Sequence, residues 1–149
     1  MVRWITPPAV CAALATAACG LPAKTASPER EAEARALLEE LAAGQDDRLT
    51  ARMSARVDGA QMAAQLPFLK SLVPQGPVPE GETVGWHANA GTAGSTYEVV
   101  RTYDYPDRVL TVSTMFMKEG AQWKVVGFHL APTMKAGATP VTIAPPDPG

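Results

Sequence analysis

The sequence predicts an α+β protein in which N-terminal helices pack on an antiparallel sheet of about four strands, after a cleaved signal peptide. Between residues 27 and 73, apolar residues recur at the three- and four-residue spacing of helices. Between residues 83 and 130 they alternate, as in strands with one buried face. Residues 74–81, rich in Pro and Gly, suit neither element. Helices followed by strands is the segregated order of α+β folds.

Length and composition limit the function classes. The chain has 149 residues, of which 46% are hydrophobic, and this suffices for one domain. Its 13 Lys and Arg against 15 Asp and Glu give a net charge of −2. Such a chain lacks the basic surface that binds phosphate backbones. We therefore expect a single domain over residues 27–133 and no nucleic-acid partner.

Residues 1–18 are predicted to be a secretory signal peptide. A short start with Arg3 precedes an apolar stretch, and small residues follow up to Cys19. A membrane-spanning helix needs about 20 apolar residues, whereas the apolar character here ends at Gly20. The segment Ala17-Ala18-Cys19-Gly20 resembles the lipobox of bacterial lipoproteins. That resemblance implies cleavage before Cys19, a lipid on its sulfur and, with Gly20 next, an anchor in the outer membrane facing the periplasm.

The alternative is an ordinary secreted protein cut after an Ala-x-Ala motif, with Cys19 incidental. Cysteine usage favours the lipoprotein, because Cys11 lies in the leader and the processed chain keeps one cysteine that cannot form an internal disulfide. A thioether to diacylglycerol removes a free thiol that is a liability in an oxidising compartment. Residues 19–26 then form the lipidated N-terminus and a short tether.

The first predicted helix begins at Ser27-Pro28-Glu29, where a capping hydroxyl, a proline at the first helical position and an acid all favour a helix start. Gly44 ends it as a C-terminal cap. Between these ends, charged residues surround an apolar stripe of Ala34, Leu37, Leu38 and Leu41.

A second helix is predicted to be capped by Asp46 or Asp47, with Leu49, Met53 and Val57 at every fourth position. Arg48, Arg52 and Arg56 form a parallel basic row, either an anion site or, as we prefer, a solvated face paired with nearby acids. A third helix restarts at Asp58-Gly59 and keeps helical spacing through Val73. We expect Pro67 to kink or split it.

Four strands are predicted over residues 83–89, 95–105, 109–118 and 123–130, and the short turns between them make the sheet antiparallel. In the first, Val84, Trp86 and Ala88 share a face. One face of the second carries Tyr97, Val99, Tyr103 and Tyr105, interrupted by Arg101. In the closing hairpin, we expect Phe116, Val126 and Phe128 to face the helix that carries Leu38 and Leu41. Residues 134–149 hold four prolines and are predicted to be a largely disordered tail.

The order of elements and the closing segment Trp123-Lys124-Val125-Val126-Gly127-Phe128-His129-Leu130, followed by Pro132, resemble the last strand of small bacterial proteins of the cystatin-like cone fold. This superfamily includes nuclear transport factor and ketosteroid isomerase. The resemblance implies a curved sheet that wraps around the helices over residues 27–132. Many lipid-anchored members have no known activity, while the enzymes use an acid-base residue, often Asp or His, inside the cone.

Few residues are candidates for chemistry. A metal site would need both histidines, His87 and His129, together with carboxylates, and no spacing predicts one, so no metal or cofactor is expected. We expect His129 to be a hydrogen-bonded structural histidine. Asp104 could serve as the acid, with Tyr103 and Tyr105 as oxyanion donors, although we prefer a solvated Asp104 before a turn.

Trp86 and Tyr97 complete the candidate cavity or surface residues, together with Tyr103, Asp104 and His129. Two function classes remain open. The first is a non-catalytic binding or scaffold lipoprotein, for example an immunity-type protein, whose partner is an envelope protein or a small apolar ligand. The alternative is a small lyase or isomerase that uses an acid-base residue inside the cone.

Overall fold

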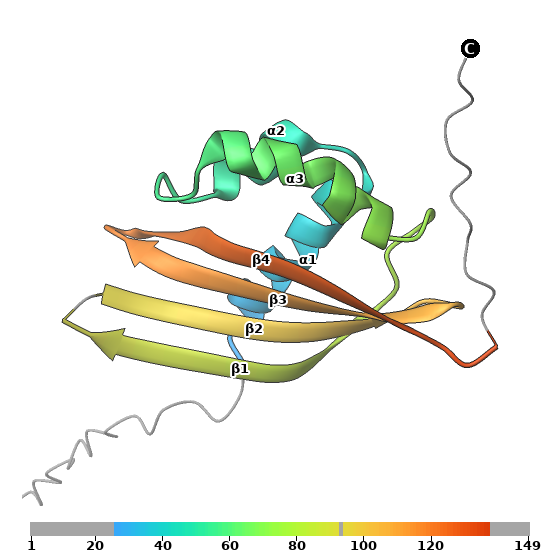
Figure 1. Ribbon diagram of the computed structural model, residues 1–149. Coiled ribbons are helices and arrows are strands. Elements are labelled where there is room, and N and C mark those ends of the chain that lie inside the picture. Colours follow the sequence, from blue (N-terminus) through green and yellow to red (C-terminus); the bar gives the residue numbers. More distant parts are fainter. Residues whose placement is uncertain (1–25, 93, 138–149) are drawn as a thin grey trace, which may run out of the picture.

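The computed structural model describes residues 26–92 and 94–137 and confirms the α+β class (Figure 1). The predicted leader, Cys19, most of the tether, and residues 138–149 of the predicted tail lie outside the described residues. The described part holds three helices and one antiparallel sheet in the order β1-β2-β3-β4. Their bounds are α1 Pro28–Ala42, α2 Asp46–Arg52, α3 Gly59–Leu72, β1 Gly81–Gly91, β2 Gly94–Asp104, β3 Arg108–Glu119 and β4 Gln122–Met134.

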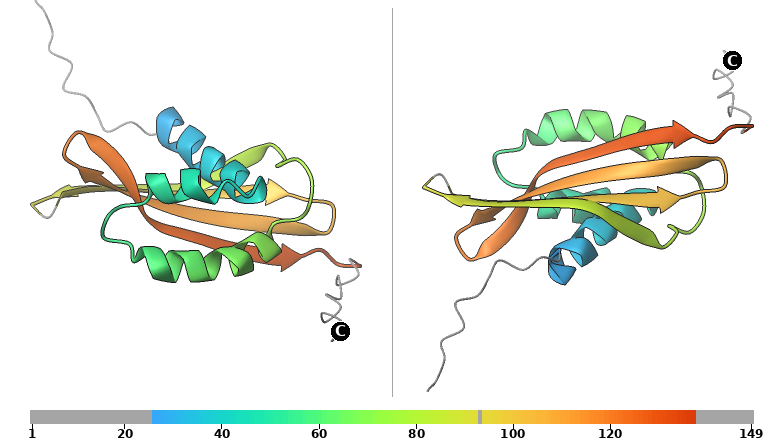
Figure 2. Two further views of the ribbon diagram at one scale, coloured as in Figure 1. Left: turned by 90° about the horizontal axis from the view of Figure 1, so that it is seen from above. Right: turned by 90° about the horizontal axis from the view of Figure 1, so that it is seen from below.

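All three helices cover one face of the sheet, which we call the inner face; seen from below, the strands lie in front of the helices (Figure 2). Alternate residues of the two central strands are buried there: Tyr97, Val99, Arg101, Tyr103, Leu110, Val112, Thr114 and Phe116. The remaining alternate residues form the outer face, which none of the three described helices covers. The predicted face of the second strand and the predicted inward position of Phe116 are therefore confirmed.

Helix α1 supplies the other half of the core. Its predicted stripe is confirmed, since Ala34, Leu37, Leu38 and Leu41 are each at most 1% exposed. Ser27 occupies the N-cap position, but its hydroxyl makes no capping hydrogen bond; instead its backbone N–H donates to the Tyr97 hydroxyl at 2.7 Å. The start of α1 is thereby fixed to β2.

Helix α2 ends earlier than the spacing predicts. Met53 is extended rather than helical and forms a parallel bridge with Val125, and the Ser54 N–H donates to the Val125 carbonyl at 2.8 Å. Hydrogen bonding to the free edge of β4 thus determines the extended conformation of Met53, although the apolar spacing in the sequence favours a helix there. The predicted cap by Asp46 or Asp47 is also wrong. Gln45 occupies the N-cap position, and its side chain makes no capping hydrogen bond.

Helix α3 begins as predicted, with the Asp58 carboxylate accepting from the Ala60 and Gln61 N–H groups at 2.8 and 3.0 Å. It runs through Pro67 without being split. Proline removes one helical hydrogen bond, but Leu66 and Leu69 on either side are buried and hold the helix against the sheet.

The closing hairpin carries a β-bulge that alters the predicted inner face. Phe116 pairs with Val125 and Met115 with Gly127, so Val126 is the extra residue. Val125 is 2% exposed and faces the helices, whereas Val126, predicted to face them, is only partly buried. Phe128, opposite buried Thr114, does face inward but is also only partly buried. Strand β4 continues past the predicted end at residue 130, and also past the predicted domain boundary at residue 133.

A second bulge lies in β1. Thr83 pairs with Arg101 and Gly85 with Val100, so Val84 is the unpaired residue and is 57% exposed. The simple alternation predicted one continuous face of Val84, Trp86 and Ala88. The bulge removes Val84 from that face. A bulge shifts the alternation by one residue and increases the local twist.

Candidate functional site

The sequence-predicted candidates are dispersed by the fold. Tyr97 and Tyr103 are buried on the inner face, whereas Asp104 alternates with Tyr103 and is exposed on the outer face. The Asp104 carboxylate lies 2.5 Å from the Lys135 ammonium. The solvated position that we preferred for Asp104 agrees with this geometry, and the carboxylate does not lie beside the tyrosine hydroxyls.

Tyr103 and Tyr105 place their hydroxyls in the core. Within the described part of the chain, neither hydroxyl has a hydrogen-bond partner. Burial raises the pKa of both phenols, and for Tyr103 the nearby Arg101 guanidinium partly opposes that rise. Both phenols therefore lose their protons only at a pH above the usual range for tyrosine.

Both histidines lie on the outer face. His87 is opposite Glu98 and His129 is opposite Ser113, while the Ser113 hydroxyl donates to Glu98 at 2.6 Å. The expected structural role of His129 is wrong, because its side chain is exposed. Across residues 26–92 and 94–137, no group of three His, Cys, Asp or Glu is placed to hold a metal ion.

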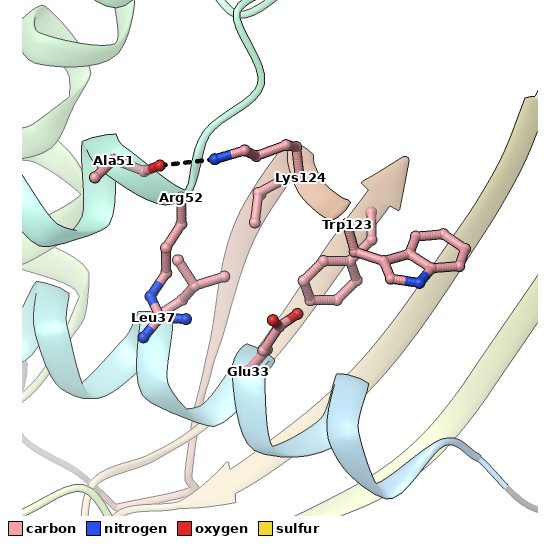
Figure 3. Close-up of a pocket in the computed structure, with 8 residues that line it drawn as sticks. Glu33, Leu37, Ala51, Arg52, Trp123 and Lys124 are labelled. Carbon is pink, nitrogen blue, oxygen red and sulfur yellow. Dashed lines mark hydrogen bonds between the residues drawn. The ribbon is translucent and has the colours of Figure 1, made fainter. Parts of the chain in front are cut away.

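A pocket of about 190 Å³ opens between the middle of α1, the end of α2 and the β3–β4 hairpin (Figure 3). We call it the hairpin pocket. Its floor is apolar, and its rim includes three charged side chains. The floor consists of Leu37, Phe116 and Val125, and the rim of Glu33, Ala51, Arg52, Trp123 and Lys124.

Arg30 fixes the aromatic wall of the hairpin pocket. Its guanidinium lies 5.5 Å from the ring centroids of both Phe116 and Trp123, and it forms an ion pair with Glu33. The arginine side chain is only 11% exposed. Cation–π contacts of this kind are strongest where water is excluded. Arg30 therefore orients both an aromatic ring and a rim carboxylate.

Two further contacts hold α2 at the pocket. Arg52 donates to both carboxylate oxygens of Glu40 on α1, at 3.0 and 3.1 Å. The Lys124 ammonium donates to the Ala51 carbonyl at 3.3 Å (Figure 3). Arg56 also lies 3.8 Å from Glu119. Two arginines of the predicted basic row, Arg52 and Arg56, thus pair with acids, which agrees with the preferred interpretation of this row as a solvated face paired with nearby acids.

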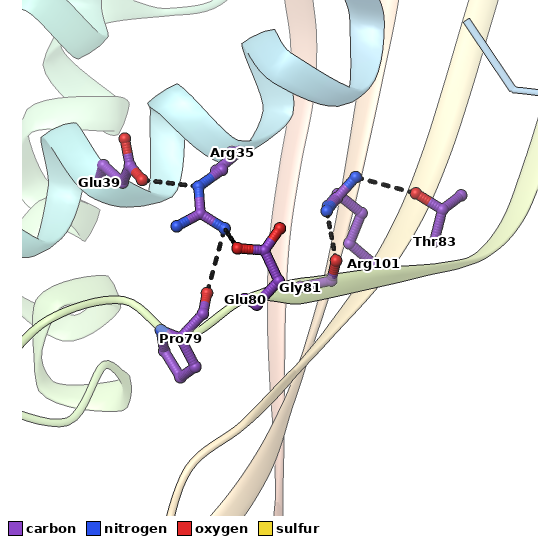
Figure 4. A network of polar contacts seen from close by, with 7 residues as sticks. All are labelled: Arg35, Glu39, Pro79, Glu80, Gly81, Thr83 and Arg101. Atoms are coloured by element: carbon purple, nitrogen blue, oxygen red, sulfur yellow. Dashed lines mark hydrogen bonds and ion pairs between the residues drawn. The ribbon is translucent and has the colours of Figure 1, made fainter. Parts of the chain in front are cut away.

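The start of β1 is held by a separate polar network (Figure 4). Arg101, buried on the inner face, donates to the Gly81 carbonyl at 2.6 Å and to the Thr83 hydroxyl at 2.9 Å. Arg35 of α1 bonds Glu39 at 2.7 Å and the Pro79 carbonyl at 3.2 Å. These contacts attach the 79–83 segment to α1 and β2, so their role is structural.

Sequence reasoning missed the hairpin pocket, although one signal was present. Arg30 lies four residues before Ala34 and so continues the apolar stripe of α1. A charged residue on such a stripe indicates a buried ion pair or an aromatic contact. The rim residues themselves come from α1, α2 and β4, and no local sequence pattern joins these three elements.

Comparison with protein-family models, with curated proteins and with solved structures found no match. None of the helices in the described ranges is both long enough and apolar enough to cross a membrane. The function must therefore be argued from the residues themselves.

Proposed function

We propose that this chain is a lipid-anchored envelope protein whose folded domain is a non-catalytic binding module. The anchor is proposed from the sequence Ala17-Ala18-Cys19-Gly20, with removal of residues 1–18 and acylation of Cys19. Two or more lipid chains on one residue give a lasting anchor, where a single chain binds reversibly. The domain then faces the periplasm, with the outer membrane favoured by Gly20.

We further propose that the domain belongs to the cystatin-like cone class. The support is architectural: three helices precede a four-stranded antiparallel meander and cover one of its faces (Figure 2). Within that class, the lyase or isomerase alternative needs an acid or base inside the cone. Asp104 is on the outer face with its side chain 73% exposed and is paired with Lys135, so the geometry favours binding.

The observation that carries the binding proposal is the hairpin pocket, with its apolar floor and charged rim. Sites for drug-sized ligands measure roughly 300–1,000 Å³, and this pocket, at about 190 Å³, is smaller. It suits one aliphatic side chain of a peptide, whose amide groups would meet the rim charges. Glu33 can accept from a peptide N–H, and Lys124 can donate to a peptide carbonyl. The proposed partner is thus a segment of another envelope protein that carries an exposed Leu or Ile.

The pocket is tested with N-acetyl-leucinamide as the probe and ¹H–¹⁵N NMR as the measurement. Shifts should concentrate at Leu37, Val125 and the Trp123 indole, and N-acetyl-glutamate should not produce them. Ala51→Phe, which fills the pocket mouth, should abolish the shifts. Thr50→Phe, at an exposed position of the same helix outside the pocket, should keep them. Unchanged shifts in Ala51→Phe would refute the pocket as the binding site.

The anchor is tested by fractionation. Cys19→Ala should move the protein from the membrane fraction to the soluble fraction, whereas Cys11→Ala, within the proposed leader, should leave it in the membrane. A Cys19→Ala protein that stays in the membrane fraction would contradict the lipoprotein proposal.

A further inference from the structure

The turn end of the β1–β2 hairpin differs in composition from the rest of the domain. Residues 83–97 contain no Asp, Glu, Lys or Arg, although charged residues are 19% of the chain. Trp86, Ala88 and Ala90 alternate along the inner face of β1 and are all exposed. The Trp86 ring stacks on Tyr97 at 6.0 Å between centroids, with Trp86 itself 37% exposed. We call the three exposed residues Trp86, Ala88 and Ala90 the hairpin surface.

The hairpin surface adjoins the point where the chain enters the domain. Ser27, directly before α1, donates its N–H to the Tyr97 hydroxyl. On the other side of the α1 start, Arg30 stacks against Trp123. The β1–β2 and β3–β4 turns are at this same end of the sheet (Figure 1). The two tryptophans of the described chain therefore flank the start of α1.

The length of the tether limits how far this end can lie from a membrane. Seven residue steps separate Cys19 from Ala26, and a fully extended chain spans at most about 3.6 Å per residue, or roughly 25 Å in total. The far end of the sheet is another strand length away, about 40 Å for the 13 residues of β4. That far end carries the charged residues Asp104, Asp107 and Lys135.

We propose that the hairpin surface lies in the headgroup region of the membrane that carries the anchor. This inference rests on the proposed lipid at Cys19. Trp favours the membrane–water interface, where its apolar ring and its polar N–H are both accommodated. The segment 83–97 carries no charged side chain, so its contact with lipid adds no cost of removing charges from water. Contact at this end would orient the domain with β1–β2 against the lipid, and the short tether makes the contact nearly intramolecular.

The experiment uses tryptophan emission in the lipidated, processed protein reconstituted into phosphatidylethanolamine–phosphatidylglycerol vesicles, with or without brominated acyl chains. Trp4 lies in the proposed leader, so Trp86 and Trp123 alone would emit. Trp123→Phe isolates Trp86. Its emission should shift to the blue on reconstitution and be strongly quenched by the brominated lipid.

A matched control places the fluorophore at the far end. Met134→Trp, at a position 45% exposed at the end of β4, is combined with Trp86→Phe and Trp123→Phe, and its emission should not respond to bromine. Intact mass of the same preparation reports whether Cys19 carries lipid. With lipid present, an unquenched Trp86 overturns the contact and leaves the anchor standing. Lipid absent from Cys19 overturns both.

Discussion

The bulge in β4 predicts losses of stability of different size for two adjacent, identical residues. Val125 lies opposite Phe116 and faces the helices, while Val126 is the extra residue of the bulge. Without the bulge, the alternation in the sequence places Val126 inside. Val125→Ala and Val126→Ala are therefore a matched pair that differs only in position.

The expected magnitudes follow from burial. Val125 is 2% exposed, and truncation to Ala removes two carbons, worth about 0.8 kcal/mol each in transfer free energy. The unfilled cavity adds to this, so the free energy of unfolding should fall by about 2–3 kcal/mol. Val126 is only partly buried, and its truncation should cost about 0.5–1 kcal/mol.

Urea denaturation followed by far-ultraviolet circular dichroism measures the difference. For a domain of this size the urea m-value is about 1–3 kcal/mol/M, so Val125→Ala should lower the midpoint by about 1 M relative to Val126→Ala. An equal m-value in both variants is the control for two-state behaviour. A larger loss in Val126→Ala would show that the register assigned to β4 is wrong.

Four further outcomes are expected. Phe116 is 1% exposed, so Phe116→Ala should lower the free energy of unfolding by about 3–5 kcal/mol in the same urea assay. Phe128 is only partly buried, so Phe128→Ala should lower it by clearly less. Arg101→Met should cost about 1–3 kcal/mol by thermal denaturation, since the β1 carbonyl and hydroxyl it satisfies lose their donor. Burial raises the pKa of Tyr103. The stability linked to its neutral form is therefore present below the ordinary tyrosine pKa and is lost as pH rises through the raised pKa. Tyrosinate absorbance should develop together with alkaline unfolding. Truncation after Lys135 should leave the melting temperature nearly unchanged, and a large fall would show that the tail is structural.

The fold class and most faces could be predicted because they depend on local periodicity. The stripe from Ala34 to Leu41 and the alternation from Tyr97 to Tyr103 each repeat within one element, and their burial follows from the repeat. The errors occur where hydrogen bonds between distant segments decide the outcome. Met53 leaves its helical pattern to pair with Val125, and the bulges at Val84 and Val126 depend on the neighbouring strand.

The candidate site was less predictable for a related reason. The hairpin pocket joins Glu33, Arg52 and Lys124 from three elements, and their proximity is a property of the packing. Asp104 and Tyr103, which are neighbours in sequence, point to opposite faces because successive strand residues alternate. Adjacency in sequence therefore suggested a site that strand geometry separates.

Intact mass spectrometry of the protein extracted from membranes decides whether the proposed processed chain begins at a lipidated Cys19. We expect the mass of residues 19–149 increased by a diacylglycerol and an additional acyl chain. The mass of a chain that starts at Met1, or at another residue with Cys19 unmodified, would refute the proposed anchor.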